Sequence, residues 1–262
     1  MHRAVDGKHE IITATDAAPG DVNEAHLMFP LLEKHKETTD IEAETVVADS
    51  KYGTIDNFLS CHDQGIQAHI PDLRDAAIKR IAKNDIFLED RFLYDPATDT
   101  YTCPAGVQLK PKSLHISRQS RDYAAPGKVC AACQLREQCT KNKAGRTIKR
   151  HLRQDVLERM RAVSRSANAR HDIKTRQHLM ERSFAKSTRY GFDQARWRGL
   201  WRMRIQEYLT CAIQNMQVLI AYAFKPKKAA AARLLSVQKT AVEAFGSCCL
   251  LSPGFKIRIL AL

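Results

Sequence analysis

The chain has 262 residues, of which 42 are basic and 29 are acidic, and this balance gives a formal net charge of +13 at pH 7. A length of this order accommodates one large domain or one domain with an insertion, and the hydrophobic content of 44% can supply a real core. The positive surplus favours a polyanionic partner such as nucleic acid, and a basic protein without such a partner is the alternative.

The sequence carries no sign of export or membrane insertion. The N-terminal Met-His-Arg-Ala-Val-Asp lacks the apolar stretch of a secretory signal. The longest apolar run, 208–224, is interrupted by glutamine and asparagine, so it is too polar to span a bilayer and predicts a buried helix. We therefore expect a cytoplasmic location, where the eight cysteines are reduced and a cysteine cluster indicates a metal, not disulfides.

The first elements predicted along the chain are a hairpin and a helix. A strand over 3–5, a turn at 6–7 and a second strand over 10–15 have the pattern of a hairpin. Asp21 follows Pro-Gly and is expected to cap a helix. Apolar residues at helical spacing then predict that helix across 27–32.

The next elements predict a sheet with parallel strands. A short apolar run over 45–49 ends on a carboxylate, as in an interior strand covered on both faces. A helix over 54–62 and a strand over 66–70 follow, and Pro71 stops the strand. This order of elements predicts an α/β fold.

The pattern changes at residue 84. Short strand signals and four of the eight cysteines fall within 84–150, which we interpret as a β-rich insertion into an α/β domain. The domain would begin with 1–83 and continue with helices in 151–224, while 225–262 is a basic and apolar tail whose pattern is compatible with disorder. The helices expected in the third segment are 154–164, 168–186 and 200–224.

Two acidic residues are candidates for chemistry. Asp49 ends an apolar strand, at the sheet edge where α/β sites are usually built, and capping of the next helix is its alternative role. Glu181 lies mid-helix between the apolar Met180 and Phe184. It shares one face with basic and polar side chains, so an ion-pair partner is its alternative role. The other residues of that face are Lys174, Gln177 and Thr188.

Taken together, the segments around these two acids resemble the DDE-type transposases of bacterial insertion sequences. Val-Ala-Asp-Ser-Lys-Tyr-Gly at 47–53 is similar to the stretch around the second acidic residue of that family. Glu-Arg-Ser-Phe-Ala at 181–185 is similar to the helix that carries the terminal glutamate. Further similar segments are 4–6, 19–22, 195–200, 206–210 and 214–215, so that the resemblance covers roughly 2–220.

The resemblance implies the C-terminal part of an RNase H-like catalytic domain that cuts and joins DNA, a mixed sheet with flanking helices. Asp49 and Glu181 would hold Mg²⁺ or Mn²⁺, hard cations that prefer carboxylate oxygen. Two such ions about 4 Å apart can activate the attacking oxygen and stabilise the leaving one. The implied partners are insertion-sequence ends and target DNA, with a homodimer on the DNA. The residues expected at DNA phosphates are Lys174, Arg176, Arg182 and Lys186.

Two departures from the family pattern bear on activity. The first aspartate of the family lies on a strand before 3–5, so we expect the chain to begin after that strand, with Asp6 a turn residue and not its substitute. The lysine that follows the terminal glutamate has no match, because Thr188 holds its position. We therefore expect a truncated copy of a transposase. A catalytically inactive, transposase-derived nucleic-acid-binding protein is the alternative.

The cysteines of 84–150 form the other local signal. Cys130 and Cys133 have knuckle spacing, Cys139 follows, and Cys103 begins Cys-Pro-Ala-Gly. Four thiolates can close a tetrahedral structural Zn²⁺ site, which would stabilise an insertion with a small core. Reduced, partly buried thiols are the alternative, because Cys103 is far from the pair and the gap to Cys139 is wider than a second knuckle.

Overall fold

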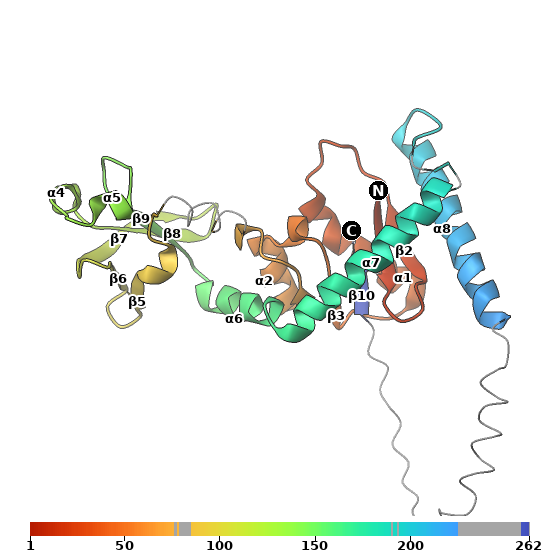
Figure 1. Ribbon diagram of the computed structural model, residues 1–262, viewed down its shortest axis with the longest axis horizontal. Coiled ribbons are helices and arrows are strands. Elements are labelled where there is room, and N and C mark those ends of the chain that lie inside the picture. Colours follow the sequence, from red (N-terminus) through yellow and green to blue (C-terminus); the bar gives the residue numbers. More distant parts are fainter. Residues whose placement is uncertain (76–77, 79–84, 190, 193, 225–257, 262) are drawn as a thin grey trace, which may run out of the picture.

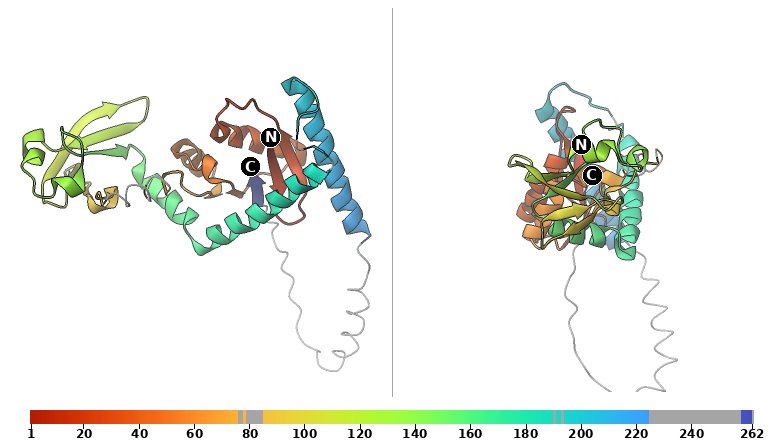
Figure 2. Two further views of the ribbon diagram at one scale, coloured as in Figure 1. Left: turned by 45° about the horizontal axis from the view of Figure 1, so that its top comes forward. Right: turned by 90° about the vertical axis from the view of Figure 1, so that its left-hand side faces the viewer.

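The computed structural model describes residues 1–75, 78, 85–189, 191–192, 194–224 and 258–261. Two five-stranded sheets organise them, one mixed and one antiparallel, toward opposite ends of the molecule (Figures 1 and 2). We call the parts built on them the mixed-sheet region (the described residues of 1–78, 154–224 and 258–261) and the antiparallel region (85–151). The predicted α/β class is confirmed at this level.

The chain begins with the predicted hairpin. Strands β1 (His2–Asp6) and β2 (Ile12–Asp16) pair antiparallel across it. The Asp6 carboxylate accepts a hydrogen bond from the His9 backbone N–H at 2.7 Å, as a turn residue does.

The first helical segment has a different cap from the one predicted. The side chain of Asn23, and not that of Asp21, accepts the Ala25 N–H at 3.1 Å and caps the short 3₁₀ helix η1 (Glu24–Leu27). This turn leads directly into α1 (Met28–Thr39). Both residue types are good caps, so their local sequence alone did not select the one that lies adjacent to the first turn.

The parallel half of the sheet follows the prediction closely. Strand β3 (Thr45–Val47), the short 3₁₀ helix η2 (Ser50–Tyr52), helix α2 (Ile55–Asp63) and strand β4 (Gln67–His69) come in this order, and β3 and β4 are parallel. Thr54 caps α2 by accepting the Asn57 N–H.

The middle strand of the mixed sheet comes from the other end of the sequence. The spatial order is β2-β1-β10-β3-β4, and β10 (Arg258–Ala261) is antiparallel to β1 and parallel to β3. The expectation for the tail therefore needs correction at these four residues. Their strand is too short for a periodic pattern to reveal, and 225–257 and 262 lie outside the described residues.

Helices cover both faces of this sheet. On one face, α1, α2 and α6 (Gln154–Ser164) pack against Ala4, Val46 and Ala68. On the other, α7 (Ala167–Arg189) and α8 (Leu200–Ala223) pack against Val5 and Val47. Alternate residues of each strand thus serve opposite cores, as the pleat requires.

The antiparallel region is a meander in which sequence neighbours are also spatial neighbours. Its order is β5-β6-β7-β8-β9, and the tyrosines 94, 101 and 123 pack together on it. Its strands are β5 (Leu93–Asp95), β6 (Thr100–Thr102), β7 (Gln108–His115), β8 (Ser120–Ala124) and β9 (Thr147–His151). Its short helices are η3 (Glu89–Arg91), α4 (Gly127–Ala131) and α5 (Arg136–Cys139).

Helix α8 differs from the buried helix predicted over this apolar run. Its buried side chains are mostly polar, while Leu209, Leu219 and Tyr222 are 57%, 60% and 67% exposed. The prediction of a buried helix is wrong, because an ion pair and amide hydrogen bonds, described below, seat the helix through its polar side. Apolar content alone could not reveal which side faces the sheet.

Candidate functional site

Asp49 lies just beyond the end of β3, where the strand leaves the core. Val46 and Val47 before it are fully buried, whereas Asp49 itself is partly exposed. Its carboxylate accepts hydrogen bonds from the Ser50 N–H and, at 3.1 Å, from the Ser50 hydroxyl, so it caps η2. The capping role is therefore real, and it fixes the carboxylate at the sheet edge.

Glu181 projects from the exposed side of α7, above the buried Leu179 and Met180. Gln177, one turn earlier, donates a hydrogen bond to its carboxylate at 3.0 Å. Within the described part of the chain Glu181 makes no ion pair, so nothing there assigns it the alternative role of balancing a basic neighbour.

The fold brings these two acids, 132 positions apart (181 − 49), to one pocket. The pocket has a volume of about 480 Å³ and opens beside the C-terminal end of β3 and the middle of α7. The remaining residues that line it are Pro71, Ile173, Arg176, Gln177, Met180 and Phe184. Two carboxylates from distant parts of the sequence thus line the same pocket.

Arg176 is the buried cation of this pocket. It is 6% exposed, and burial lowers the pKa of its guanidinium, while the nearby Asp49 and Tyr52 act in the opposite direction. Its position beside Asp49 makes it a local counter-charge to that carboxylate. An exposed DNA contact, as expected from the sequence, does not fit this degree of burial.

The other three basic residues predicted at DNA phosphates lie on the outer sides of α7. Lys174 is exposed, and Lys186 is partly exposed. Arg182 is exposed and forms an ion pair with Glu10 at 2.9 Å. Lys174 is therefore accessible to a polyanion near Glu181, whereas Arg182 is paired with Glu10.

Among the residues that the structure describes, the pocket is lined by two acidic side chains and no third. Across the ranges that the structure describes, no three histidine, cysteine, aspartate or glutamate side chains are arranged to hold a metal ion. As they stand, Asp49 and Glu181 supply carboxylate oxygens of the right chemistry for a hard cation, but only part of a full ligand set.

Two further bonds hold helices against β4, close to this pocket. His69 Nδ1 and Asp172 Oδ2 are 2.8 Å apart, and both side chains are buried, so α7 is tied to the end of β4. The hydroxyl of Ser164, at the end of α6, donates to the Ala68 carbonyl at 2.7 Å. Both contacts hold helices α6 and α7 in a fixed position over the sheet.

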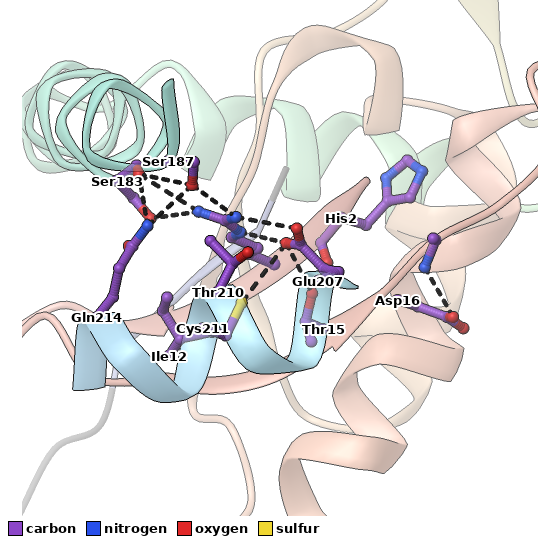
Figure 3. Close-up of polar contacts among 12 residues, drawn as sticks. His2, Ile12, Thr15, Asp16, Ser183, Ser187, Glu207, Thr210, Cys211 and Gln214 are labelled. Carbon is purple, nitrogen blue, oxygen red and sulfur yellow. Dashed lines mark hydrogen bonds and ion pairs between the residues drawn. The ribbon is translucent and has the colours of Figure 1, made fainter. Parts of the chain in front are cut away.

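A buried ion pair fixes α8 against β1 and α7. Arg3 is 0% exposed and binds Glu207, itself 2% exposed, through two hydrogen bonds. The Arg3 guanidinium also donates to the hydroxyls of Ser183 and Ser187, at 2.8 and 3.0 Å. Figure 3 shows Glu207 of α8 and the two serines of α7 converging on this network.

Amide side chains of α8 complete the attachment. Gln214 donates to the Ser183 carbonyl and to the Ser187 hydroxyl, each at 2.9 Å (Figure 3). The side-chain amide of Asn215 accepts a hydrogen bond from the Ile12 N–H and donates one to the Ile12 carbonyl, each at 2.8 Å. It thereby satisfies the backbone of β2 at Ile12 as a neighbouring strand would. The helix that carries Glu181 is thereby locked between the sheet and α8.

Sequence reasoning missed the Arg3–Glu207 pair as a unit. The available signal was the set of polar residues that interrupt an apolar helix, because buried polar groups require partners. The partner on β1 could not be identified, since 203 residues separate the pair (207 − 3 − 1) and one arginine among many carries no distinguishing pattern.

The four cysteines of the antiparallel region line one small cavity of about 40 Å³. Cys103 follows β6, Cys130 lies in α4 with Cys133 just beyond it, and Cys139 ends α5. Burial raises the pKa of the Cys139 thiol, and the three other thiols contribute in the same direction. The four cysteines thus line the same cavity, but within the described ranges no three potential ligands are arranged to hold a metal ion, so the zinc site stays a prediction.

The fold and the site define a mixed α/β domain in which two carboxylates line one pocket beside a basic helix. A family model described as the transposase DDE domain matches residues 102–220. This segment contains the antiparallel region from the end of β6 onward, Glu181 and most of α8, and it confirms the predicted relationship to DDE-type transposases.

No curated protein and no solved structure matched the chain. Among the helices of the described ranges, none combines the length and the apolar character that crossing a membrane requires.

Proposed function

We propose that this chain acts in DNA transposition, as part of a DDE transposase from a bacterial insertion sequence that cuts DNA and joins strands. The observation that carries the proposal is that Asp49 and Glu181 line the same pocket. The family match over 102–220 supports it, because the match includes the helix that presents Glu181.

The arrangement of the mixed sheet supports an RNase H-like core. One half of the sheet is antiparallel, the other is parallel, and helices cover both faces. Asp49 leaves the sheet at the carboxyl end of a parallel strand, which is where ligands bind in open α/β sheets.

In this proposal Asp49 and Glu181 hold Mg²⁺ or Mn²⁺ through carboxylate oxygens, and the cation supplies Lewis-acid stabilisation of phosphoryl transfer. The cap on η2 orients Asp49, and Gln177 orients Glu181. Arg176 balances the negative charge of Asp49 inside the pocket. Lys174, Arg182 and Lys186 hold the DNA backbone in place by contacting its phosphates.

The alternative is a transposase-derived DNA-binding protein without catalysis. The observation that favours it is the lack of a third acidic residue beside Asp49 and Glu181 in the described part of the chain. Both functions require DNA binding, so metal binding and strand cleavage discriminate between them.

The test uses the full chain, Mn²⁺ alone, a fluorescent DNA duplex and supercoiled plasmid. For the catalytic function we expect plasmid cleavage that depends on Mn²⁺, and Mn²⁺ affinity that falls at least about tenfold in Asp49→Asn and in Glu181→Gln. Glu158→Gln, an exposed carboxylate on α6, is the matched control and should behave as the parent.

The other possible results discriminate between the two functions. Duplex binding that weakens with salt, without Mn²⁺ binding or cleavage, would support the DNA-binding alternative. A chain that binds no duplex even at low salt would contradict both functions.

We further propose that the four cysteines bind a structural Zn²⁺. The support is their common cavity in a region with a small core. Metal analysis of the purified full chain should find zinc, and Cys133→Ser should lose it, whereas Cys248→Ser, outside 84–150 in the sequence, should retain it. A chain that contains no zinc, with a Tm unaffected by chelator, would contradict the site.

Localisation and assembly follow from the same function. We propose that the protein works in the cytoplasm, where bacterial DNA lies, and that it acts as a homodimer on the two ends of the element. Light scattering with and without duplex DNA tests the assembly, and a single copy on DNA would contradict it.

A further inference from the structure

The mixed sheet has a slot between β1 and β3, and β10 fills it. Ala4, Val5 and Asp6 of β1 pair with Ala261, Leu260 and Ile259, antiparallel. On the other side Thr45, Val46 and Val47 of β3 pair with Arg258, Ile259 and Leu260, parallel. Every residue of β10 is therefore matched on at least one side, and two are matched on both.

With β10 in place, the residues that flank the slot are buried. Ala4, Val46 and Val47 are 0% exposed and Val5 is 2% exposed. Without a strand between them, the backbone N–H and C=O groups that face the slot would lose partners in the interior, at a cost comparable to that of lost hydrogen bonds. The two halves of the sheet, β2-β1 and β3-β4, require an inserted strand to form one surface.

The occupant is not a direct continuation of either neighbouring strand. Thirty-three residues, 225–257, separate β10 from the end of the α8 segment, and a chain of that length can span up to about 110 Å. The sequence Arg-Ile-Leu-Ala has the branched and apolar character of an interior strand, with no proline to remove a donor. Backbone pairing with β1 and β3 positions it.

We propose that the slot between β1 and β3 is a strand-binding site, and that residues 258–261 are an exchangeable occupant of it. The ligand it takes is an extended apolar segment that lies parallel to β3 and antiparallel to β1, added by backbone pairing on both edges. In this structure the C-terminal strand of the same chain serves as that ligand. The inference concerns the sheet and holds independently of DNA cleavage.

The occupant also bears on the pocket. Leu260 pairs with Val47, two residues before Asp49, so β10 supports the end of β3 from which Asp49 emerges. Loss of the strand would free one edge of β3 close to the carboxylate. Occupancy of the slot is therefore a means of positioning Asp49.

The test cleaves the full chain between α8 and β10 and measures whether the C-terminal fragment remains bound to the rest of the protein. A specific protease site is placed within 235–245, the purified protein is cleaved without denaturant, and the C-terminal fragment should co-elute with the body. A labelled peptide of residues 253–262 in excess should then replace the fragment. The same peptide with Leu260→Pro is the control and should not bind, because proline cannot donate to an interior ladder.

The uncut protein gives a second, independent measurement. Leu260→Pro should lower the Tm by at least about 5 °C, whereas Leu251→Pro, the same change outside β10, should lower it less. Separation of the fragment from a body that keeps its circular dichroism and Tm would overturn the proposal. Equal binding of the two peptides, or equal Tm values for the two variants, would also overturn it. None of these measurements needs metal or DNA.

Discussion

The two sheets of this molecule are assembled in opposite ways. In the antiparallel region every strand pairs with its neighbour in sequence, from β5 to β9. In the mixed-sheet region the central strand comes from residues 258–261, and a buried arginine on β1 finds its partner on α8. The antiparallel region holds no pair of candidate catalytic acids. In the mixed-sheet region, Asp49 and Glu181 line the same pocket.

This difference shows that a site built by long-range assembly depends on contacts far from it. Glu181 touches neither Arg3 nor Glu207 in the hydrogen-bond network, yet its helix is held by their ion pair through Ser183 and Ser187. In the antiparallel region, the contacts of Asp99 with Tyr94, Tyr123 and Arg121 instead join residues at most 24 positions apart.

The largest expected effect is on the mixed-sheet region. Glu207→Gln leaves the Arg3 charge buried without its counter-charge, and breaking such a pair costs about 3–5 kcal/mol. Urea unfolding should show this loss, while Glu158→Gln, at an exposed position, should stay within about 0.5 kcal/mol of the parent. Parent-like stability of Glu207→Gln would contradict the role given to the pair.

A smaller effect should be confined to the antiparallel region. Tyr123→Phe removes a hydroxyl that donates to the Asp99 carboxylate at 2.6 Å, and hydrogen bonds to charged groups contribute about 1.5–3 kcal/mol. Hydrogen exchange should accelerate in β6–β8 and remain unchanged in β3. Tyr208→Phe, on the exposed side of α8, is the matched control. Acceleration in both sheets would show that the regions are not independent.

The smallest effect is a dependence on acid. The hydroxyl of Tyr123 holds the pKa of Asp99 below its ordinary value of 3.8, with Tyr94 and Arg121 adding to the effect against the opposing influence of burial. A lowered pKa in the folded state gives stability that is present above pH 3.8 and is lost as the pH falls through the folded value. Below pH 3.8, the stability of Asp99→Asn should therefore fall less steeply with decreasing pH than that of the parent. Fluorescence-monitored unfolding at several pH values measures this. Identical acid profiles would contradict this contribution.

Much of the fold could be predicted because its signals are local. The hairpin turn, the strand that ends before Asp49 and the cap at Thr54 each depend on a few adjacent residues. Helix α6 begins and ends where the sequence pattern placed it, at 154 and 164. Local turn and spacing preferences are sufficient for such elements.

The remaining features depend on tertiary partners. β10 is short and apolar like many segments, and only the unpaired edges of β1 and β3 give it a role. The buried side of α8 is set by Arg3 and Ser183, not by its apolar residues. For the site, the sequence indicated Asp49 and Glu181 through the family resemblance, but it could not show that Arg176 lies buried beside Asp49.

The place of β10 also has a consequence for how the protein acquires its structure. Its pairing with β1 joins positions 4 and 261, a separation of 257 residues (261 − 4), and it is synthesised after every other described element. Contacts so distant in sequence slow folding, because the loop must close before the pairing is gained. The antiparallel meander can form early, while the sheet that presents Asp49 closes last.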